Sequence, residues 1–260
     1  MKTGLAASWQ YMDDSCPEDI KALLSGSRSE LRPDSKYQVI WKTRNKYVLL
    51  LESVSGRKFV YKAPLRIKNF IKYCLRPGPY GREAVNYECI RNMGIPVADL
   101  LAAGETRKFF KLQSGFIVTA FAEDFSDGRD FMPGGCMRQE KELLREFTER
   151  NFRLLAVLHN NNFIHKGFTP ANLLFRKRLE ADGAGNWLDI KWIDLASCRR
   201  VMPLQNKKVL QARDLSLFFY YLDCGREEKL RYLEIYCREM NSCRTTPEEL
   251  LKRIEQNPVR

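Results

Sequence analysis

Short runs of alternating apolar and polar residues dominate the first half of the chain. Three of them follow one another closely, with the sequences YQVIWK, KYVLLLE and RKFVYKA, at residues 37–42, 46–52 and 57–63. They are rich in β-branched and aromatic residues, and SVSG separates the last two, a pattern typical of antiparallel strands joined by turns. Two more strands are predicted at 108–113 and 115–123, with Ser114 and Gly115 as the turn between them. This half of the chain therefore predicts an antiparallel sheet.

One helix interrupts the sheet pattern. The segment GREAVNYECIRNMGIP predicts a helix that opens after Gly81, stops at Gly94 and is closed by Pro96. A second helix is predicted from Glu140 to Leu158, where the apolar residues recur at helical spacing, with Glu and Arg opposite. Its apolar stripe consists of Leu143, Phe147, Leu154 and Leu158.

The rest of the second half is mainly helical with one strand-rich interruption. Residues 172–194 contain two apolar runs around a Gly-rich turn at 182–186, which predicts a β-hairpin. Helices are predicted from about Val209 to the end. Gly, Pro, Asp and Ser cluster at 123–135, which marks a boundary between two lobes.

The expected organisation is therefore α+β. It consists of an N-terminal extension (1–35), a β-rich lobe (36–122), a linker (123–135) and a helical lobe (136–260).

Composition adds an electrostatic preference. The 260 residues include 44 Lys and Arg against 32 Asp and Glu, a net charge of +12, which favours an anionic partner. Nucleic acid, an anionic membrane face and a phosphorylated glycolipid all meet that requirement. No apolar run approaches the ~20 residues that span a bilayer, so a cytoplasmic location is expected. Eight cysteines without a C-x-x-C pair, and only two histidines, favour reduced thiols over a zinc cluster or disulfides.

An ordered set of motifs indicates a fold family. A strand carries Lys62, a helix carries Glu83, and HNNNFIHKGFTPANLLF (159–175) is followed, after the predicted hairpin, by KWIDLASC (191–198). In order and spacing, residues 36–225 resemble the protein-kinase-like fold, and specifically the bacterial lipopolysaccharide kinases that phosphorylate Kdo or heptose sugars of the inner core. The resemblance implies a two-lobed α+β structure. It also implies phosphoryl transfer from MgATP to a sugar hydroxyl, with ATP and Mg²⁺ as cofactors.

The resemblance assigns residues to the nucleotide. Lys62 in FVYKAP corresponds to the phosphate-binding Lys, since phosphoryl transfer depends on neutralising the charge of the phosphates. Glu83 corresponds to the acid that holds this Lys, because it lies eleven residues before Gly94; Glu88 is the alternative.

The adenine and the phosphates need further groups. Backbone groups between Ala120 and Glu123 are expected to pair with the adenine edge, and Val39, Val48 and Val60 are expected to form an apolar wall. The predicted adenine-pairing residues are Ala120, Phe121 and Glu123. No G-x-G-x-x-G loop occurs in the first hairpin; KTRN (42–45) stands there, with Lys42 or Arg44 as substitutes for backbone amides.

The metal and the loop take the remaining motif residues. Asp194 of the IDL motif and Asn172, seven residues after His165, correspond to the Mg²⁺ ligands, and their oxygen donors suit a hard cation. His165 is expected to be structural, with Asp214 of ARDLSLF holding the loop backbone. His159 matches the helix that packs on this loop.

One side chain required for full activity is absent. Kinases of this fold carry Asp two residues after the loop His, and here that residue is Gly167. General-base assistance is worth about 10²- to 10⁴-fold in rate. Three hypotheses remain: an active sugar kinase using another acid, from Asp124–Asp130 or the substrate itself; a nucleotide-binding pseudokinase; or a basic module that binds membrane or nucleic acid.

The acceptor is expected to be anionic. The basic groups RKR (176–178) and CRR (198–200) flank the predicted hairpin and could hold a lipopolysaccharide core sugar, although a solvated face explains them equally well. Peripheral contact with an anionic inner membrane face is compatible with the charge. No motif that reads DNA or RNA is present, so specific nucleic-acid binding is not expected.

Overall fold

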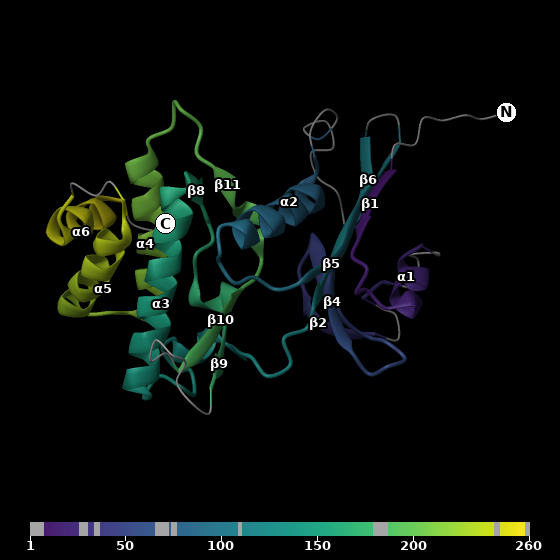
Figure 1. The fold of residues 1–260 in the computed structure, drawn as a ribbon, viewed down its shortest axis with the longest axis horizontal. Helices are drawn as coiled ribbons and strands as arrows, with labels where there is room; N and C mark the ends of the chain where they lie inside the picture. The colour runs from purple at the N-terminus through teal and green to yellow at the C-terminus, as the bar shows by residue number, and fades with distance from the viewer. Residues whose placement is uncertain are drawn as a thin grey trace. The chain divides into compact units, whose positions relative to one another are not determined.

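The computed structural model describes residues 8–25, 31–33, 37–65, 73, 77–108, 111–178, 187–241 and 245–257. The chain forms two compact units (Figure 1). The first comprises Met1–Tyr87 and Ala98–Glu123, and the second comprises Glu88–Val97 and Asp124–Arg260. The turn predicted at 182–186 lies outside the described residues.

The first unit is built on one antiparallel sheet of six strands in the order β1-β5-β6-β4-β3-β2. Its strands are β1 (Ser8–Met12), β2 (Gln38–Lys42), β3 (Lys46–Glu52), β4 (Lys58–Pro64), β5 (Leu100–Lys108) and β6 (Lys111–Ala120). The predicted strands β2, β3 and β4 are confirmed almost residue for residue. The sequence predicts neither β1, which pairs with β5, nor helix α1 (Glu18–Ser25).

Strict alternation divides β3 and β4 between two faces of this sheet. Tyr47, Leu49 and Leu51 on β3 and Phe59 and Tyr61 on β4 are buried. They form one core cluster with Ile20 and Leu24 of α1, which covers this face (Figure 1). The residues between them, among them Val48, Val60 and Lys62, point to the other face, because successive strand side chains alternate.

The predicted turn at Ser114 and Gly115 is wrong. Both residues lie inside β6, where they pair with Thr106 and Glu105 of β5. Gly115 marks a close approach instead of a turn: a Cβ atom there would lie 2.6 Å from Cδ2 of Tyr80. Glycine in a strand interior has this second use, and the sequence alone does not distinguish the two.

Helix α2 (Pro79–Asn92) supplies the residue that faces Lys62. It begins at Pro79, whose fixed φ suits the first helical position, three residues before the predicted first residue. It ends before Gly94, whose φ of +79° is the left-handed conformation that commonly follows a helix. The predicted end is therefore confirmed to within two residues.

The second unit is mainly helical. Its helices are α3 (Lys141–Asn160), α4 (Lys207–Leu222), α5 (Arg226–Glu239) and α6 (Pro247–Gln256). The buried face of α3 includes Leu143, Phe147 and Leu158, so the predicted stripe is confirmed apart from Leu154, which is half-buried. Within the described residues, no helix is long and apolar enough to cross a membrane.

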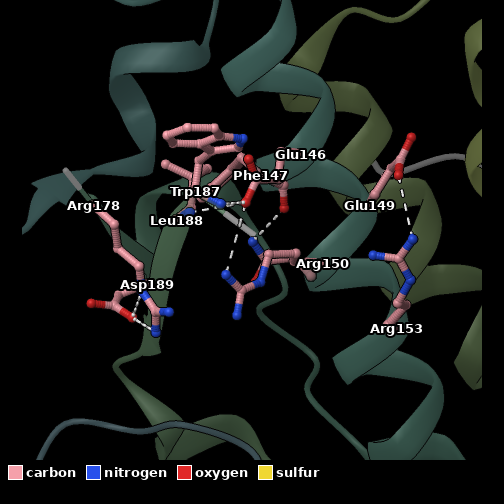
Figure 2. A network of polar contacts seen from close by, with 10 residues as sticks. Glu146, Phe147, Glu149, Arg150, Arg153, Arg178, Trp187, Leu188 and Asp189 are labelled. Atoms are coloured by element: carbon pink, nitrogen blue, oxygen red, sulfur yellow. Dashed lines mark hydrogen bonds and ion pairs between the residues drawn. The ribbon is translucent and has the colours of Figure 1, made fainter. Parts of the chain in front are cut away.

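The predicted hairpin is present in this unit. Strands β9 (Leu173–Lys177) and β10 (Leu188–Trp192) pair antiparallel, and β7 (Ser126–Asp127) joins β9 at the other edge. Glu146 of α3 attaches the hairpin to the helix, because its Oε1 accepts the N–H groups of Trp187 (2.6 Å) and Leu188 (2.9 Å) at the start of β10 (Figure 2). A second small ladder joins β8 (Phe163–Ile164) to β11 (Arg199–Arg200).

Candidate active site

A buried ion pair lies on the face of the six-stranded sheet opposite α1. Nζ of Lys62 donates to both carboxylate oxygens of Glu83, each at 3.0 Å. The two side chains are only 12% and 3% exposed. Glu88, the alternative partner, is exposed. Separating such a pair would leave a buried charge uncompensated, which is costly. Glu83 therefore keeps the amine of Lys62 in one position.

A second buried carboxylate holds the helix that carries Glu83. Glu105 of β5 is 1% exposed and accepts hydrogen bonds from the N–H groups of Gly78 (3.0 Å) and Gly81 (2.9 Å). Negative charge at a helix N-terminus satisfies unpaired N–H groups and the helix dipole. Arg107 neutralises Glu105 from the same strand at 3.1 Å and also donates to the carbonyl of Tyr73.

The approach between Glu105 and α2 requires glycine. A Cβ atom on Gly78 would lie 2.3 Å from Oε1 of Glu105. Glu105 is not among the residues that the sequence motifs predict for the site. The available signal is an acidic residue in the middle of the otherwise apolar strand LLAAGET, following a Gly-Pro helix start.

Tyr80 is buried at the same end of helix α2. Burial, followed by the negative charge of Glu83, raises the pKa of Tyr80 far above its ordinary value. Its phenol therefore stays neutral.

The residues predicted for adenine divide into two groups. Val60 lies two residues before Lys62 on β4, so both side chains are on the same face of the sheet. Val48 of β3 pairs with Lys62 and is on that face too. Val39 pairs with Leu49, on the face that α1 covers, so the structure does not place it with Val60. The reason is an irregularity in the register of β2 between Val39 and Trp41, which reverses the face expected from alternation.

The end of β6 leaves only part of its backbone available. The N–H of Ala120 donates to Asp99 (2.9 Å) and that of Phe121 to Lys58 (3.0 Å). Glu123 lies 3.8 Å from the Lys58 amine. The carbonyls of this segment, and the N–H groups of Ala122 and Glu123, remain the candidates for contact with a base.

The second unit contains the loop predicted to be catalytic, and Asp214 holds it. Its carboxylate accepts the N–H groups of His165 and Lys166, both at 2.7 Å. The same carboxylate lies 3.2 Å from Nε2 of His159, whose other ring nitrogen is 2.7 Å from the hydroxyl of Tyr236. The contact that the resemblance implies for Asp214 is thus present. Lys166 adopts φ +61°, a conformation costly for a non-glycine residue unless its surroundings impose it.

His165 is fully buried and packs against two aromatic rings. Its ring centroid lies 5.7 Å from that of Phe168 and 5.5 Å from that of Trp192. Burial lowers the pKa of His165, outweighing the nearby charge of Asp214, so the imidazole is neutral. A neutral, inaccessible ring fits a structural role.

Gly167 leaves room for a side chain. A Cβ atom there would lie 3.6 Å from Nδ2 of Asn172 and 3.7 Å from Nδ1 of His165, which are ordinary van der Waals distances. No carboxylate atom of the described residues lies closer to that position. In the predicted substitute segment, Asp127 is committed elsewhere, because Arg129 binds its two carboxylate oxygens at 2.8 and 2.6 Å.

The two predicted metal ligands lie at the same end of the hairpin, the end opposite the connection between β9 and β10. Asn172 precedes β9 and Asp194 follows β10, and the N–H of Ile193 donates to the carbonyl of Asn172 at 2.9 Å. Nδ2 of Asn172 donates to the carbonyl of Gly167 (2.8 Å), which leaves Oδ1 as the acceptor that a cation would use. Asp194 adopts φ +54°, a left-handed conformation that Asp tolerates better than most residues.

One carboxylate and one amide oxygen suit Mg²⁺, which takes few protein ligands and keeps water and substrate phosphates. Larger clusters, of three or more His, Cys, Asp or Glu side chains able to hold a metal, do not occur in the part of the chain that the structure describes.

A basic depression of about 900 Å³ lies on the hairpin side of this unit. It is lined by Asp124, Ser126, Arg176, Lys177, Arg178 and Asp189. Arg176 and Arg178 both bind Asp189, at 2.7 and 2.5 Å. Burial alone would raise the pKa of Asp189, but these hydrogen bonds lower it below its ordinary value. Lys177 is exposed beside them, so the lining carries three cations against two carboxylates.

Comparison with known proteins identifies the fold. No protein-family model and no curated protein sequence matches the chain. Among solved structures, WaaP in complex with acyl carrier protein matches with a TM-score of 0.65 and 19% identity, over 95% of this chain and 97% of that one. The BubR1 kinase domain matches with a TM-score of 0.50 and 14% identity, over 84% and 78%. The chain therefore has the protein-kinase-like fold that the order of its motifs predicts.

Proposed function

We propose that the chain is a phosphotransferase that moves the γ-phosphoryl group of MgATP to a hydroxyl of an anionic acceptor, of the class of lipopolysaccharide inner-core sugars. The observation that carries this proposal is the buried Lys62–Glu83 pair in a protein-kinase-like fold. The sugar class rests on the resemblance of the motifs to those of the lipopolysaccharide kinases, and the fold shared with WaaP is compatible with it.

Lys62 has the role of binding the nucleotide phosphates. Glu83 orients its amine, and Glu105 holds the helix from which Glu83 projects. A preorganised cation stabilises developing negative charge without reorganising during the reaction. Val48 and Val60 supply apolar surface for the base, together with backbone groups at the end of β6.

Asn172 and Asp194 are the residues that would hold Mg²⁺. When bound, the ion neutralises the charge of the phosphates. Asn172 presents Oδ1 because its amide nitrogen is held by Gly167, and Asp194 supplies a carboxylate. Asp214 holds the loop that begins at His165 in place, because its carboxylate accepts the N–H groups of His165 and Lys166.

The acceptor hydroxyl must lose its proton as its oxygen bonds to the γ-phosphorus and ADP leaves. Gly167 offers no group for this proton. Two kinds of group could take this proton instead. One is the carboxylate of Asp124 or Asp130 in the predicted substitute segment, since Arg129 does not hold either of them through both oxygens. The other is a carboxylate or phosphate on the acceptor molecule itself. The basic depression around Arg176 and Lys177 suits an acceptor with such groups.

Gly167 also supports a second candidate, a pseudokinase that binds nucleotide without transferring phosphate. Loss of the base slows the chemical step by about 10²- to 10⁴-fold but leaves the nucleotide-binding groups intact. The two candidates share ATP binding and differ only in turnover.

Two experiments separate these candidates from each other and from a basic interaction module. MgATP should raise the melting temperature of the wild-type protein, because ligand that binds only the native state stabilises it. The absence of a shift at millimolar ATP would exclude both nucleotide-binding candidates. Turnover with isolated inner-core acceptor, abolished by Asp194→Ala, would support the active enzyme.

Gly167→Asp sharpens the distinction between enzyme and pseudokinase. The new Cβ atom meets its neighbours at ordinary distances, so the fold should tolerate it. In a pseudokinase that lacks only the base, this variant should gain acceptor phosphorylation. In an enzyme that already uses another base, the gain should be small, since the base is not missing. Gly167→Ala is the matched control, because it fills the same space without a carboxylate.

A further inference from the structure

The segment from Leu195 to Arg213, which includes β11 and the start of α4, has an unusual charge. From Leu195 to Arg213 the chain contains no Asp or Glu, and it carries five basic residues. These are Arg199, Arg200, Lys207, Lys208 and Arg213. Arg199, Arg200 and Lys208 are exposed. Asp194 and Asp214, the nearest acids in the chain, lie just outside this segment.

At its centre, this basic segment exposes apolar side chains. Met202 is 61% exposed and Leu204 is fully exposed, at 102%, with the exposed Pro203 between them. We call residues 201–206 the apolar tip. Figure 1 shows the chain between β11 and α4 as a loop that protrudes beyond the start of α4. Apolar residues this exposed lose favourable burial unless something covers them.

The apolar tip is held in shape by its base. The carbonyl of Asn162 accepts the N–H of Val201 at 2.7 Å, and Oδ1 of the same residue accepts Nζ of Lys207 at 2.6 Å. Within the tip, the N–H of Gln205 donates to the carbonyl of Met202 (2.9 Å), and its side-chain oxygen accepts the N–H of Met202 (3.1 Å). These hydrogen bonds close the turn, and the side chains of Met202 and Leu204 remain exposed.

We propose that the apolar tip and its flanking cations dock onto an anionic membrane surface. Apolar side chains enter the boundary between headgroups and acyl chains, while Lys and Arg beside them attract anionic lipids. Charge complementarity selects this occupant, because cations flank the tip on both sides and the segment contains no acid. Val54 provides a contrast: it is 94% exposed, but it lies between Ser53 and Ser55.

Docking here would have a consequence for the proposed activity, and this step alone depends on that activity. Arg199 follows Asp194 by five residues in the same unit. A membrane bound to the tip would thus adjoin the segment that carries a proposed metal ligand, where a lipid-borne acceptor is needed.

Vesicle flotation without nucleotide tests the inference directly. The full chain is mixed with phosphatidylcholine vesicles or with vesicles that also contain phosphatidylglycerol. We expect binding only to the anionic vesicles. Leu204→Asp should weaken this binding about tenfold or more, because it replaces an inserted apolar side chain with a charge. Since each basic residue near an anionic surface contributes about fivefold, Arg199→Gln with Lys208→Gln should weaken it about 25-fold.

Matched controls make the test specific to the tip. Val54→Asp changes an equally exposed apolar residue elsewhere, and Arg238→Gln with Lys252→Gln removes two exposed charges elsewhere. Both should bind anionic vesicles like the wild type. Leu204→Asp should keep the wild-type melting temperature, since Leu204 makes no buried contact to lose.

Three results would overturn the proposal: no binding of the wild type to anionic vesicles, undiminished binding by Leu204→Asp, or equal weakening by Val54→Asp. The second would mean that the overall charge of +12 attracts anionic surfaces without insertion of the tip. Because the assay contains no ATP, its failure is distinguishable from failure of the proposed phosphotransferase.

Discussion

Removal of the Glu105 carboxylate should destabilise the first unit and loosen the start of α2. Glu105→Ala deletes the acceptor of three hydrogen bonds, from Gly78, Gly81 and Arg107, in a position only 1% exposed. Deleting one partner of a buried ion pair costs about 3–5 kcal/mol, and losing a helix cap costs about 1 kcal/mol. Arg107 is 12% exposed and keeps its bond to Tyr73, so the expected total loss of stability is about 3–5 kcal/mol.

Two further variants calibrate this value. Glu105→Gln keeps the shape and one acceptor oxygen, so it should cost about 1–3 kcal/mol. Glu52→Ala removes an exposed carboxylate from β3 of the same sheet and should change stability by less than about 0.5 kcal/mol.

The assay combines urea unfolding with native-state hydrogen exchange. The amides of Gly78 and Gly81 should lose protection in Glu105→Ala, because their acceptor is gone. The same variant should show a smaller thermal shift with MgATP, since Glu83 projects from the loosened helix. A loss of stability below about 1 kcal/mol, with unchanged exchange at both glycines, would refute the role assigned to Glu105.

Three other predictions follow from the geometry. Lys62→Met should abolish the thermal shift with MgATP, while Lys58→Met on the same strand should preserve it; an intact shift in Lys62→Met would contradict the phosphate-binding role. Because burial holds the pKa of His165 below 6.5, the unfolded chain binds a proton there that the folded chain does not. Stability should therefore fall as pH drops below about 6.5, by up to about 1.4 kcal/mol per pH unit, and His165→Gln should flatten this slope in urea titrations. Gly128→Ala should cost about 1–3 kcal/mol, because its Cβ atom would lie 2.4 Å from the Pro170 carbonyl; a wild-type urea midpoint would disprove this.

The sequence predicts best what depends on local periodicity. Strands β3 and β4 and helix α3 follow directly from alternation and helical spacing, and their boundaries agree closely with the structure. The assignment of Glu83 to Lys62 follows from motif spacing, and the two side chains meet at 3.0 Å. Such features are encoded within about 20 consecutive residues or in the order of motifs.

What the sequence does not predict depends on contacts between distant segments. Glycine often marks a turn, so the sequence predicts one at Gly115, but in the structure this glycine accommodates Tyr80, 35 residues away in the chain. Val39 lies on the face that α1 covers because of a single irregularity in the register of β2, and no local sequence pattern predicts this irregularity. Glu105 gains its role only when β5 lies against the start of α2, 24 residues earlier.

The backbone bond between Ile193 and Asn172 extends the ladder of β9 and β10 by one rung beyond its last strand pair. The distance between the two proposed metal ligands beside that rung, Asn172 and Asp194, is therefore set by strand pairing and not by the connection at the far end of the hairpin. Residues could be inserted into or deleted from that connection while the donors keep their spacing, whereas a one-residue slip along either strand would turn one of them to the opposite face. Length variation at one end of this hairpin is thereby uncoupled from chemistry at the other.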